Sequence, residues 1–178
     1  MTADKNRAEQ IILEILRQAG DKGLGKTKLY KAFWLAHLFY AKDNPGYLSG
    51  WPVVRMPQGP GIDKGDALIR DLVASREITV SLEPRGPFSE RCCRFVGVTQ
   101  RPPLGAPGVE AVRQAVEYVK GLTAAEISEI SHDYSRSWRT TPDGQELDIY
   151  TDLIPDEEYA ERQCDMNHAK VALESLFL

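Results

Sequence analysis

The stretch Lys26-Thr-Lys-Leu-Tyr-Lys-Ala-Phe-Trp-Leu-Ala-His-Leu-Phe-Tyr-Ala-Lys42 decides the fold. Between Leu29 and Ala41 its residues are apolar or aromatic except at two positions, Lys31 and His37. A helix that is apolar nearly all round lies inside a domain rather than on its surface. We therefore expect residues 26–42 to form the central helix, with the other elements packed around it.

The flanking segments predict two more helices and a hairpin. Apolar residues recur at helical spacing from Ala8 to Ala19, where Gly20 ends the pattern, and again over 63–77. Apolar and polar residues alternate over 78–82 and at 93–95, on either side of an Arg-Gly-Pro interval, which predicts two paired strands. Helices followed by such a hairpin have the order of a winged helix. Between them, 44–46 is a turn, and 51–56, bounded by prolines, is at most an edge strand or a strapping loop.

The second half of the chain is predicted to be helical. A linker containing three prolines and two glycines occupies 101–108. A stripe of valines follows over 109–119, and Thr123-Ala-Ala-Glu126 is a capping box that starts the next helix at Thr123. A final helix is expected over 156–177, whose apolar residues Val171, Ala172, Leu173, Leu176 and Phe177 return to the core.

The fold class expected from these patterns is mostly α (α+β), a helical domain with a small winged-helix-like β-hairpin. At 178 residues the chain is long enough for one well-buried core, whereas a second full domain would be cramped. We expect one domain over 1–178, made of a winged-helix-like half, 1–100, and a helical half, 109–178.

Two segments some seventy positions apart have the pattern of a family signature. The first runs Leu48-Ser-Gly-Trp-Pro-Val-Val-Arg-Met-Pro-Gln-Gly-Pro60, and the second is the capped helix 122–132, which ends in Ser131-His132 and is followed by Trp138. Together with Lys28 and the aromatic-rich helix after it, they resemble the Panacea domain over about 28–153. Two positions depart from that pattern: His37 stands where an acidic residue is more usual, and Gln58 replaces a common tyrosine.

The resemblance implies a protein-binding function. Members of that family with an assigned role act mostly as antitoxins in toxin–antitoxin pairs, and one group is a proteolytic adaptor that delivers a toxin for degradation. It also implies no cofactor, a protein toxin as partner, encoded by a neighbouring gene, and a protease as a second partner if the chain is an adaptor. The family-motif residues Lys28, Ser131, His132 and Trp138 are expected to be structural.

Contacts with the partner are expected in the loop over 51–61, because loops contain a disproportionate share of functional residues. The candidates there are Trp51, Arg55, Gln58, Gly59 and Pro60. Trp51 and Trp138 are open to two interpretations, as core anchors or as binding hot spots, since large rigid aromatic rings serve both purposes. The acidic C-terminal segment is a second candidate surface, because its charge complements a basic toxin.

Charge is distributed unevenly along the chain. The net charge of −4 combines +4 over 1–42, zero over the middle and −8 over 143–178. The basic start suits a phosphate backbone or an acidic partner, and the acidic end repels nucleic acid; solvated helix faces are the alternative explanation. A winged-helix DNA-binding regulator is therefore the alternative function, with Lys26, Lys28 and Lys31 as its phosphate contacts, although we expect nucleic acid not to be the principal partner.

Three other chemistries have partial signals. Ser131 and His132 are neighbours, about 100° apart on a helix, which is poor geometry for a nucleophile and its base, so we expect no enzyme and instead a buried histidine under Trp138. Cys164 and His168 share a helix face, but two ligands make no metal site. Gly20-Asp-Lys-Gly-Leu-Gly-Lys-Thr27 has the spacing of a phosphate loop, which requires a preceding buried strand.

The location expected is the cytoplasm, with no membrane association. No stretch of eighteen apolar residues occurs, and the N-terminal residues lack the apolar core of a signal peptide. Three cysteines are an odd number, and Cys92 and Cys93 are adjacent in a strand-like segment, so no disulfide framework is implied.

Overall fold

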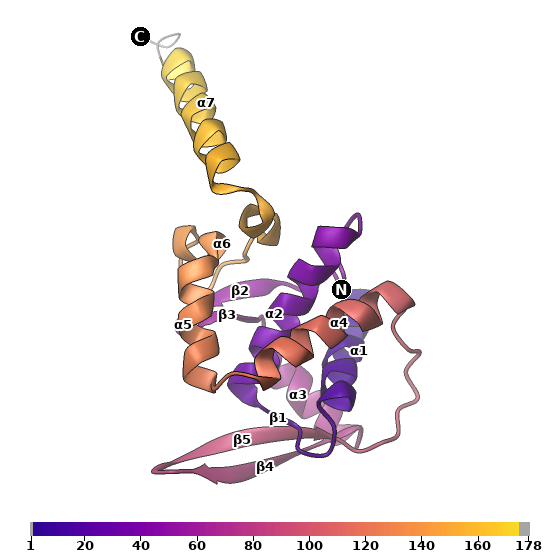
Figure 1. The fold of residues 1–178 in the computed structure, drawn as a ribbon. Coiled ribbons are helices and arrows are strands. Elements are labelled where there is room, and N and C mark those ends of the chain that lie inside the picture. The colour runs from indigo at the N-terminus through magenta and orange to yellow at the C-terminus, as the bar shows by residue number, and fades with distance from the viewer. Residues whose placement is uncertain (1, 175–178) are drawn as a thin grey trace.

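The computed structural model describes residues 2–174, without the side chains of 2, 3, 85, 88 and 167–174. It is mostly helical with small antiparallel sheets, as the sequence predicted (Figure 1). In chain order the elements are α1 (Thr2–Ala19), β1 (Leu24–Gly25), α2 (Lys26–Asp43), β2 (Val53–Met56), β3 (Gly59–Ile62), α3 (Gly65–Ala74), β4 (Ile78–Arg85), β5 (Phe88–Phe95), α4 (Ala106–Lys120), α5 (Ala124–Tyr134), α6 (Arg136–Thr140), the 3-10 helix η1 (Ile149–Leu153) and α7 (Asp156–Glu174).

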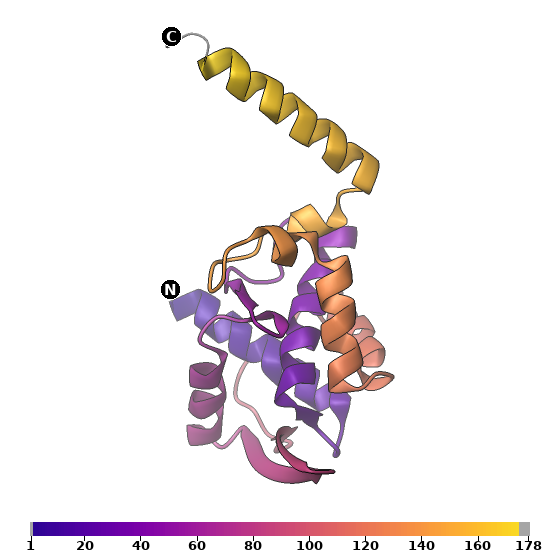
Figure 2. The same ribbon diagram turned by 90° about the vertical axis from the view of Figure 1, so that its left-hand side faces the viewer.

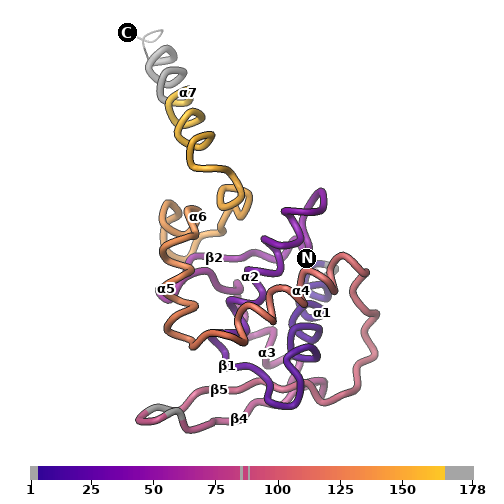
Figure 3. The backbone as a smooth tube through the Cα atoms, viewed as in Figure 1, coloured from indigo at the N-terminus to yellow at the C-terminus, as the bar shows by residue number. Residues whose placement is uncertain are grey.

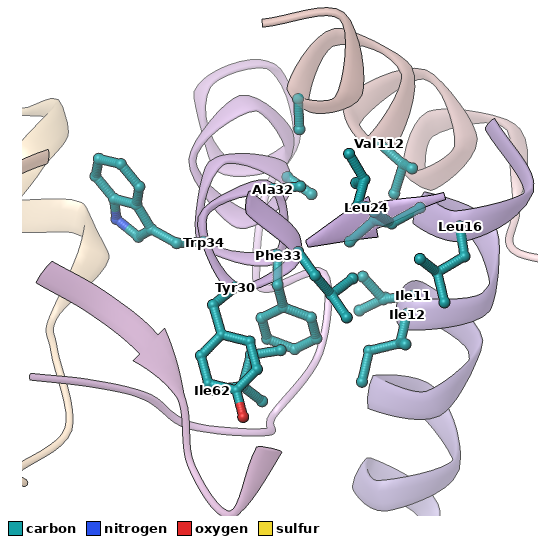
Figure 4. Close-up of a cluster of buried hydrophobic side chains, with 14 of the residues drawn as sticks. Ile11, Ile12, Leu16, Leu24, Tyr30, Ala32, Phe33, Trp34, Ile62 and Val112 are labelled. Carbon is teal, nitrogen blue, oxygen red and sulfur yellow. The ribbon is translucent and has the colours of Figure 1, made fainter. Parts of the chain in front are cut away.

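Helix α2 is the centre of the fold, as its composition predicted. Every residue from Leu29 to His37 is buried, including the two polar ones. Figure 4 shows side chains of α2 packed against residues of α1, β1, β3 and α4 in one apolar cluster. Helix α2 contacts α1, β1, β3, β5, α4, α5 and η1, and Figure 3 shows it running through the middle of the body.

The first half has the strand and helix order of a winged helix. Strand β5 lies between β1 and β4, so the order in the sheet is β1-β5-β4, with α1, α2 and α3 before the hairpin. In the hairpin, Ile78 lies opposite Phe95 and Arg85 opposite Phe88. The predicted hairpin is thereby confirmed, and β4 is left as an edge strand of this sheet.

A second hairpin is inserted between α2 and α3. The sequence predicted at most one edge strand there, but β2 pairs antiparallel with β3, from Val53 opposite Ile62 to Met56 opposite Gly59. Strand β3 is Gly-Pro-Gly-Ile, and glycine and proline disfavour strands, so residue propensities did not predict a strand here. The structure thus adds a two-stranded sheet that local patterns did not predict.

The helical half packs directly on the winged-helix half. Helix α4 lies along α1 and α2, and its buried residues Val112, Val116 and Val119 belong to the same core as Ile11 and Phe33. Helix α5 begins after Thr123 with the predicted capping box: the Thr123 hydroxyl accepts from the Glu126 N–H at 3.2 Å, and the Glu126 carboxylate accepts from the Thr123 N–H at 2.6 Å. The 101–108 linker therefore joins two halves with one continuous core.

Helix α7 differs from all the others in its surroundings. Figures 1 and 2 both show it leaving the body at the end opposite the β4–β5 hairpin. The side chains described between Asp156 and Met166 are exposed except Tyr159 and Gln163, which are half-buried. The predicted return of Val171, Ala172, Leu173, Leu176 and Phe177 to the core concerns residues outside those whose side chains are described.

His37 fastens the chain where it returns after α2. Its Nδ1 lies 2.8 Å from the Phe33 carbonyl, and its Nε2 lies 2.9 Å from the Ser49 hydroxyl. Because the carbonyl can only accept, Nδ1 is the protonated nitrogen, and the Ser49 hydroxyl donates to Nε2. The Ser49 hydroxyl in turn accepts from the Trp51 N–H at 3.3 Å. The Ser-Gly step of the signature is thus a structural contact to α2.

The neutral state of His37 predicts a pH dependence of stability. Burial lowers the pKa of His37 from 6.5 to about 4, against a smaller opposite effect of the Phe33 carbonyl. Between these values the unfolded chain binds a proton that the folded chain excludes, so the free energy of unfolding falls as pH falls. If the whole shift is realised, we expect a loss on the order of 3 kcal/mol between pH 6.5 and pH 4. Urea unfolding across this range measures it.

The variant His37→Gln is the control, because glutamine keeps a donor and an acceptor but does not titrate. The free energy of unfolding of this variant should lack the pH dependence caused by His37, whereas the pH dependence caused by the carboxylates remains. Parallel pH profiles for the two proteins would contradict a neutral buried His37.

Candidate functional site

Lys31 lies at the centre of the region where the two signature segments meet. The side chain projects from α2 toward the tip of the β2–β3 hairpin and is 2% exposed. Its Nζ donates to the Gln58 carbonyl and, at 3.0 Å, to the Pro60 carbonyl. Burial lowers the pKa of Lys31 from 10.5 to about 7. Lys31 therefore points inward and is not available as the phosphate contact considered from the sequence.

Gly59 has no room for a side chain between α2 and α5. Its φ is +96°, in the region that favours glycine, and a Cβ there would collide with the Ser131 hydroxyl and the Lys31 ammonium. The two signature segments are therefore in contact: Gly59 of the first packs against Ser131 of the second. Both segments also contact α2, the helix that contains Lys28.

Arg55, Trp138 and His132 form a layered stack beside this contact. The rings of His132 and Trp138 lie 4.1 Å apart and nearly parallel, at 12°. The Arg55 guanidinium lies 4.6 Å from the centre of the Trp138 ring on its face. Trp138 also donates from Nε1 to the Met56 carbonyl at 2.9 Å. The predicted packing of Trp138 over His132 is confirmed, and α6 is thereby held against the β2–β3 hairpin.

The surroundings of His132 favour its neutral form. Burial is the largest effect lowering its pKa, followed by the nearby Lys31, while Asp133 and the backbone of Gln58 act in the opposite direction. Its Nε2 is buried and has no hydrogen-bond partner among the residues that the structure describes. Ser131 is fully buried and its hydroxyl donates to the Ser128 carbonyl at 2.7 Å. Neither residue has the geometry of a nucleophile and its base.

The junction between α5 and α6 is fixed by a carboxylate that no sequence pattern singled out. Asp152 accepts from the Ser137 N–H at 2.7 Å and from the hydroxyls of Ser135 and Ser137, each at 2.9 Å. Burial raises its pKa, although these hydrogen bonds oppose the rise. Asp152 thus orients the short helix that contains Trp138.

The predicted partner-contact residues differ in their accessibility. Trp51 is half-buried and donates from Nε1 to the Asp63 carbonyl at 2.8 Å, which ties the base of the hairpin. Arg55 is held by the Thr141 carbonyl at 2.6 Å and by Asp143 at 2.8 Å. Gly59 and Pro60 are buried, so of the five only Gln58 is exposed. The tip of the hairpin, rather than its length, is the accessible part.

A large open groove lies next to the hairpin tip, with a volume of about 1530 Å³. It is bounded by β1, the first turns of α2 and α5, and residues 89–92 of β5, and Gln58 and His132 also line it. Five cationic side chains and one acid line it: Lys22, Lys26, Lys28, Arg91, Lys120 and Glu90. This is a cationic surface, with Lys28 among the family-motif residues within it.

The structure contradicts the interpretation of residues 20–27 as a phosphate loop. The segment connects α1 to α2, so a helix stands where a buried strand would have to precede a phosphate loop. A Cβ at Gly25 would collide with the carboxylate of Glu90, which therefore lies against the start of α2. An acid of the chain itself occupies the place where a phosphate would bind.

The surface that a winged helix presents to DNA has charges of both signs and exposed apolar side chains in this chain: α3 contains Asp66, Asp71 and the exposed Arg70. On α3, Asp66 pairs with Lys26 at 2.8 Å and Asp71 pairs with Lys5 at 2.6 Å. Five of the nine large apolar side chains that are exposed in the described part of the chain lie in the stretch from α3 to the end of β5 and just beyond: Val73, Val80, Leu82, Val96 and Val98. Residues directly opposite in a hairpin share a face, and Arg91, opposite Leu82, reaches Asp66. Leu82 thus lies on the α3 side.

Neither a cluster of metal ligands nor a membrane-spanning helix is seen among the described residues. No three His, Cys, Asp or Glu side chains among them are grouped as metal ligands require, and the His168 side chain lies outside that set. None of the helices described there is long and apolar enough to cross a membrane.

Comparisons with known proteins gave no match. No family model matches the chain, and neither does a curated protein or a solved structure. Inferences about function therefore rest on the residues and the surfaces of the chain itself.

The contact at Gly59 gives a direct test of this site. In Gly59→Ala the new methyl group must displace Ser131 or Lys31, and the alanine backbone must keep a positive φ. We therefore expect a loss of about 3 kcal/mol in the free energy of unfolding. Gly144→Ala is the matched control: its φ is +75°, but nothing lies within 4 Å of the added carbon. There we expect about 1 kcal/mol, from the left-handed conformation alone. Equal losses in urea unfolding would show that the close packing is not needed.

Proposed function

We propose that the protein is an antitoxin-like binding module that neutralises a protein toxin by direct contact. The single observation that supports it most is the apolar surface of α3 and the β4–β5 hairpin, where Leu82 is 71% exposed and Val80 39%. Exposed apolar side chains gathered in one region are typical of surfaces that bind other proteins. The resemblance of the two signature segments to Panacea domains points to the same class of partner.

The charges on this surface favour protein over nucleic acid. DNA-binding surfaces neutralise phosphates with lysine and arginine. In this chain Asp66 and Asp71 project from α3, the helix that would enter the DNA groove, and they neutralise two of the N-terminal lysines. Part of the +4 charge of residues 1–42 is therefore neutralised by ion pairs within the fold.

The proposed function is tested by co-expression with the product of the neighbouring gene. We expect that product to arrest growth when expressed alone and the wild-type chain to restore growth. Leu82→Asp places a charge in the apolar contact, and we expect it to weaken toxin binding about 10- to 100-fold, which corresponds to about 1.4–2.8 kcal/mol, and to lose the rescue.

Tyr134→Asp is the matched control, because Tyr134 is an apolar residue on α5 that is 77% exposed. It is expected to bind and rescue like the wild type. A neighbouring product that is harmless alone, or equal rescue by both variants, would contradict the proposal. The toxin's lifetime in the same cells separates neutralisation from delivery to a protease: it stays constant in the first case and shortens in the second.

A winged-helix DNA-binding regulator is the second candidate, favoured by the β1-β5-β4 strand order. Because α3 has two aspartates and only one arginine, we expect no gel shift of duplex DNA from the promoter region even at low salt. Binding that weakens steeply with added salt, as counterion release requires, would favour the regulator instead.

A further inference from the structure

The two ends of the molecule have opposite charge. At the end with the β4–β5 hairpin, the open groove is lined by five cations and one acid, and two of these cations, Lys26 and Arg91, also lie within 4.0 Å of Asp66. At the other end, α7 contains five acids and one arginine among its described side chains: Asp156, Glu157, Glu158, Glu161, Asp165 and Arg162. The same chain thus presents a cationic surface and an anionic one.

The acids of α7 are arranged along one side of the helix. Glu157, Glu161 and Asp165 follow each other at intervals of four residues, so their side chains share a face. All three are exposed. Such a stripe repels itself, and an oppositely charged surface would relieve the repulsion.

Beyond its first turn, the described side chains of α7 are exposed except Gln163, which is half-buried. The first turn is held by Arg136, which pairs with Asp156 and stacks on the Tyr159 ring at 4.2 Å. Further along, Glu161, Cys164 and Met166 are exposed. Helical stability in proteins comes mostly from the packing of one face, so a projecting helix of this kind is expected to gain stability by docking.

We propose that α7 of one copy docks in the cationic groove of a second copy. The groove has about 1530 Å³, and ten residues of helix about 15 Å long and 10 Å across occupy roughly 1200 Å³. Charge complementarity supports this occupant, because the acid stripe would face Lys22, Lys28 and Lys120. The proposal concerns self-association and does not depend on the antitoxin function.

A second copy is required because α7 cannot reach the groove of its own chain in this arrangement. Figures 1 and 2 show α7 directed away from the body, and the groove lies near the β4–β5 hairpin at the opposite end. Only Ile154 and Pro155 connect η1 to α7. Reciprocal docking, in which each copy receives the helix of the other, closes a dimer with two-fold symmetry.

Sedimentation of the full-length protein tests the association. We expect a dimer at about 0.1 M salt, where charges interact over roughly 10 Å, and a shift toward monomer at about 1 M salt, where the range is roughly 3 Å. A wild-type protein that is monomeric at the lower salt concentration would overturn the proposal.

Charge reversal then identifies the two surfaces. In one variant the groove is reversed by Lys22→Glu, Lys28→Glu and Lys120→Glu; in the other the stripe is reversed by Glu157→Lys, Glu161→Lys and Asp165→Lys. Each variant alone has two like-charged surfaces, so we expect its dimerisation to weaken at least tenfold. When the two are mixed, both contacts regain opposite charges, and we expect a heterodimer to form.

The mixing result separates the proposal from loss of folding, because unfolded variants do not recover on mixing. Lys42→Glu, at an exposed site outside the groove, is the matched control and is expected to dimerise like the wild type. Dimers that persist in both reversed variants, or a mixture that stays monomeric, would contradict docking of α7 in the groove.

Cross-linking locates the contact. Ala125 is an exposed residue of the groove, and Cys164 is exposed on α7. In Ala125→Cys, mild oxidation is expected to join position 125 of one copy to Cys164 of the other, as peptide mass spectrometry would show. Ala106→Cys, exposed at the start of α4 outside the groove, is expected to give no such link. Equal linking at both positions would contradict the proposed docking.

Discussion

The buried ammonium of Lys31 is the constraint on which the arrangement of this site depends. A charged or polar group taken out of water must be hydrogen-bonded to avoid a cost of several kcal/mol. Lys31 meets this requirement only because the Gln58 and Pro60 carbonyls are brought to it by the β2–β3 hairpin. A two-stranded hairpin is marginal by itself, so these bonds hold it to α2 as much as they satisfy the lysine. The helix and the hairpin therefore depend on each other.

The other signature residues follow from that contact. Gly59 leaves the space that Ser131 and Lys31 fill, and Pro60 provides an acceptor while having no N–H to satisfy. Trp138 then covers the hairpin from α6 and is itself placed between Arg55 and His132. Because these residues pack against one another, they form a scaffold. Exposed side chains of α3 and β4, such as Val73 and Leu82, are the ones that the proposed partner would contact.

Local signals predicted the parts of this structure that local energetics decide. The apolar run of α2, the Thr123 capping box and the alternation in β4 and β5 each specify an element within a few residues. The strand β3 could not be predicted, because Gly59-Pro60-Gly61 becomes extended through its pairing with β2 and not through propensity. The inward orientation of the Lys31 side chain could not be predicted either, because a lysine on an apolar helix can also extend its ammonium group to water. The spacing of Gly20 to Thr27 was misleading until Glu90, distant in sequence, was placed against Gly25.

A winged-helix order does not make this chain a DNA-binding protein, because the fold supplies a frame and the surface chemistry supplies the function. The helix that reads DNA in such folds here has Asp66 and Asp71 against one arginine, Arg70, and the neighbouring hairpin has the exposed Leu82. Another group of cations, which includes Lys28 and Lys120, lines the open groove. The apolar side chains of the β4–β5 hairpin, the cationic groove and the anionic α7 are distinct surfaces of one scaffold, although β5 also contributes Arg91 to the groove. The proposed toxin contact and the proposed self-association would therefore use different physical interactions, burial of apolar area for one and charge complementarity for the other.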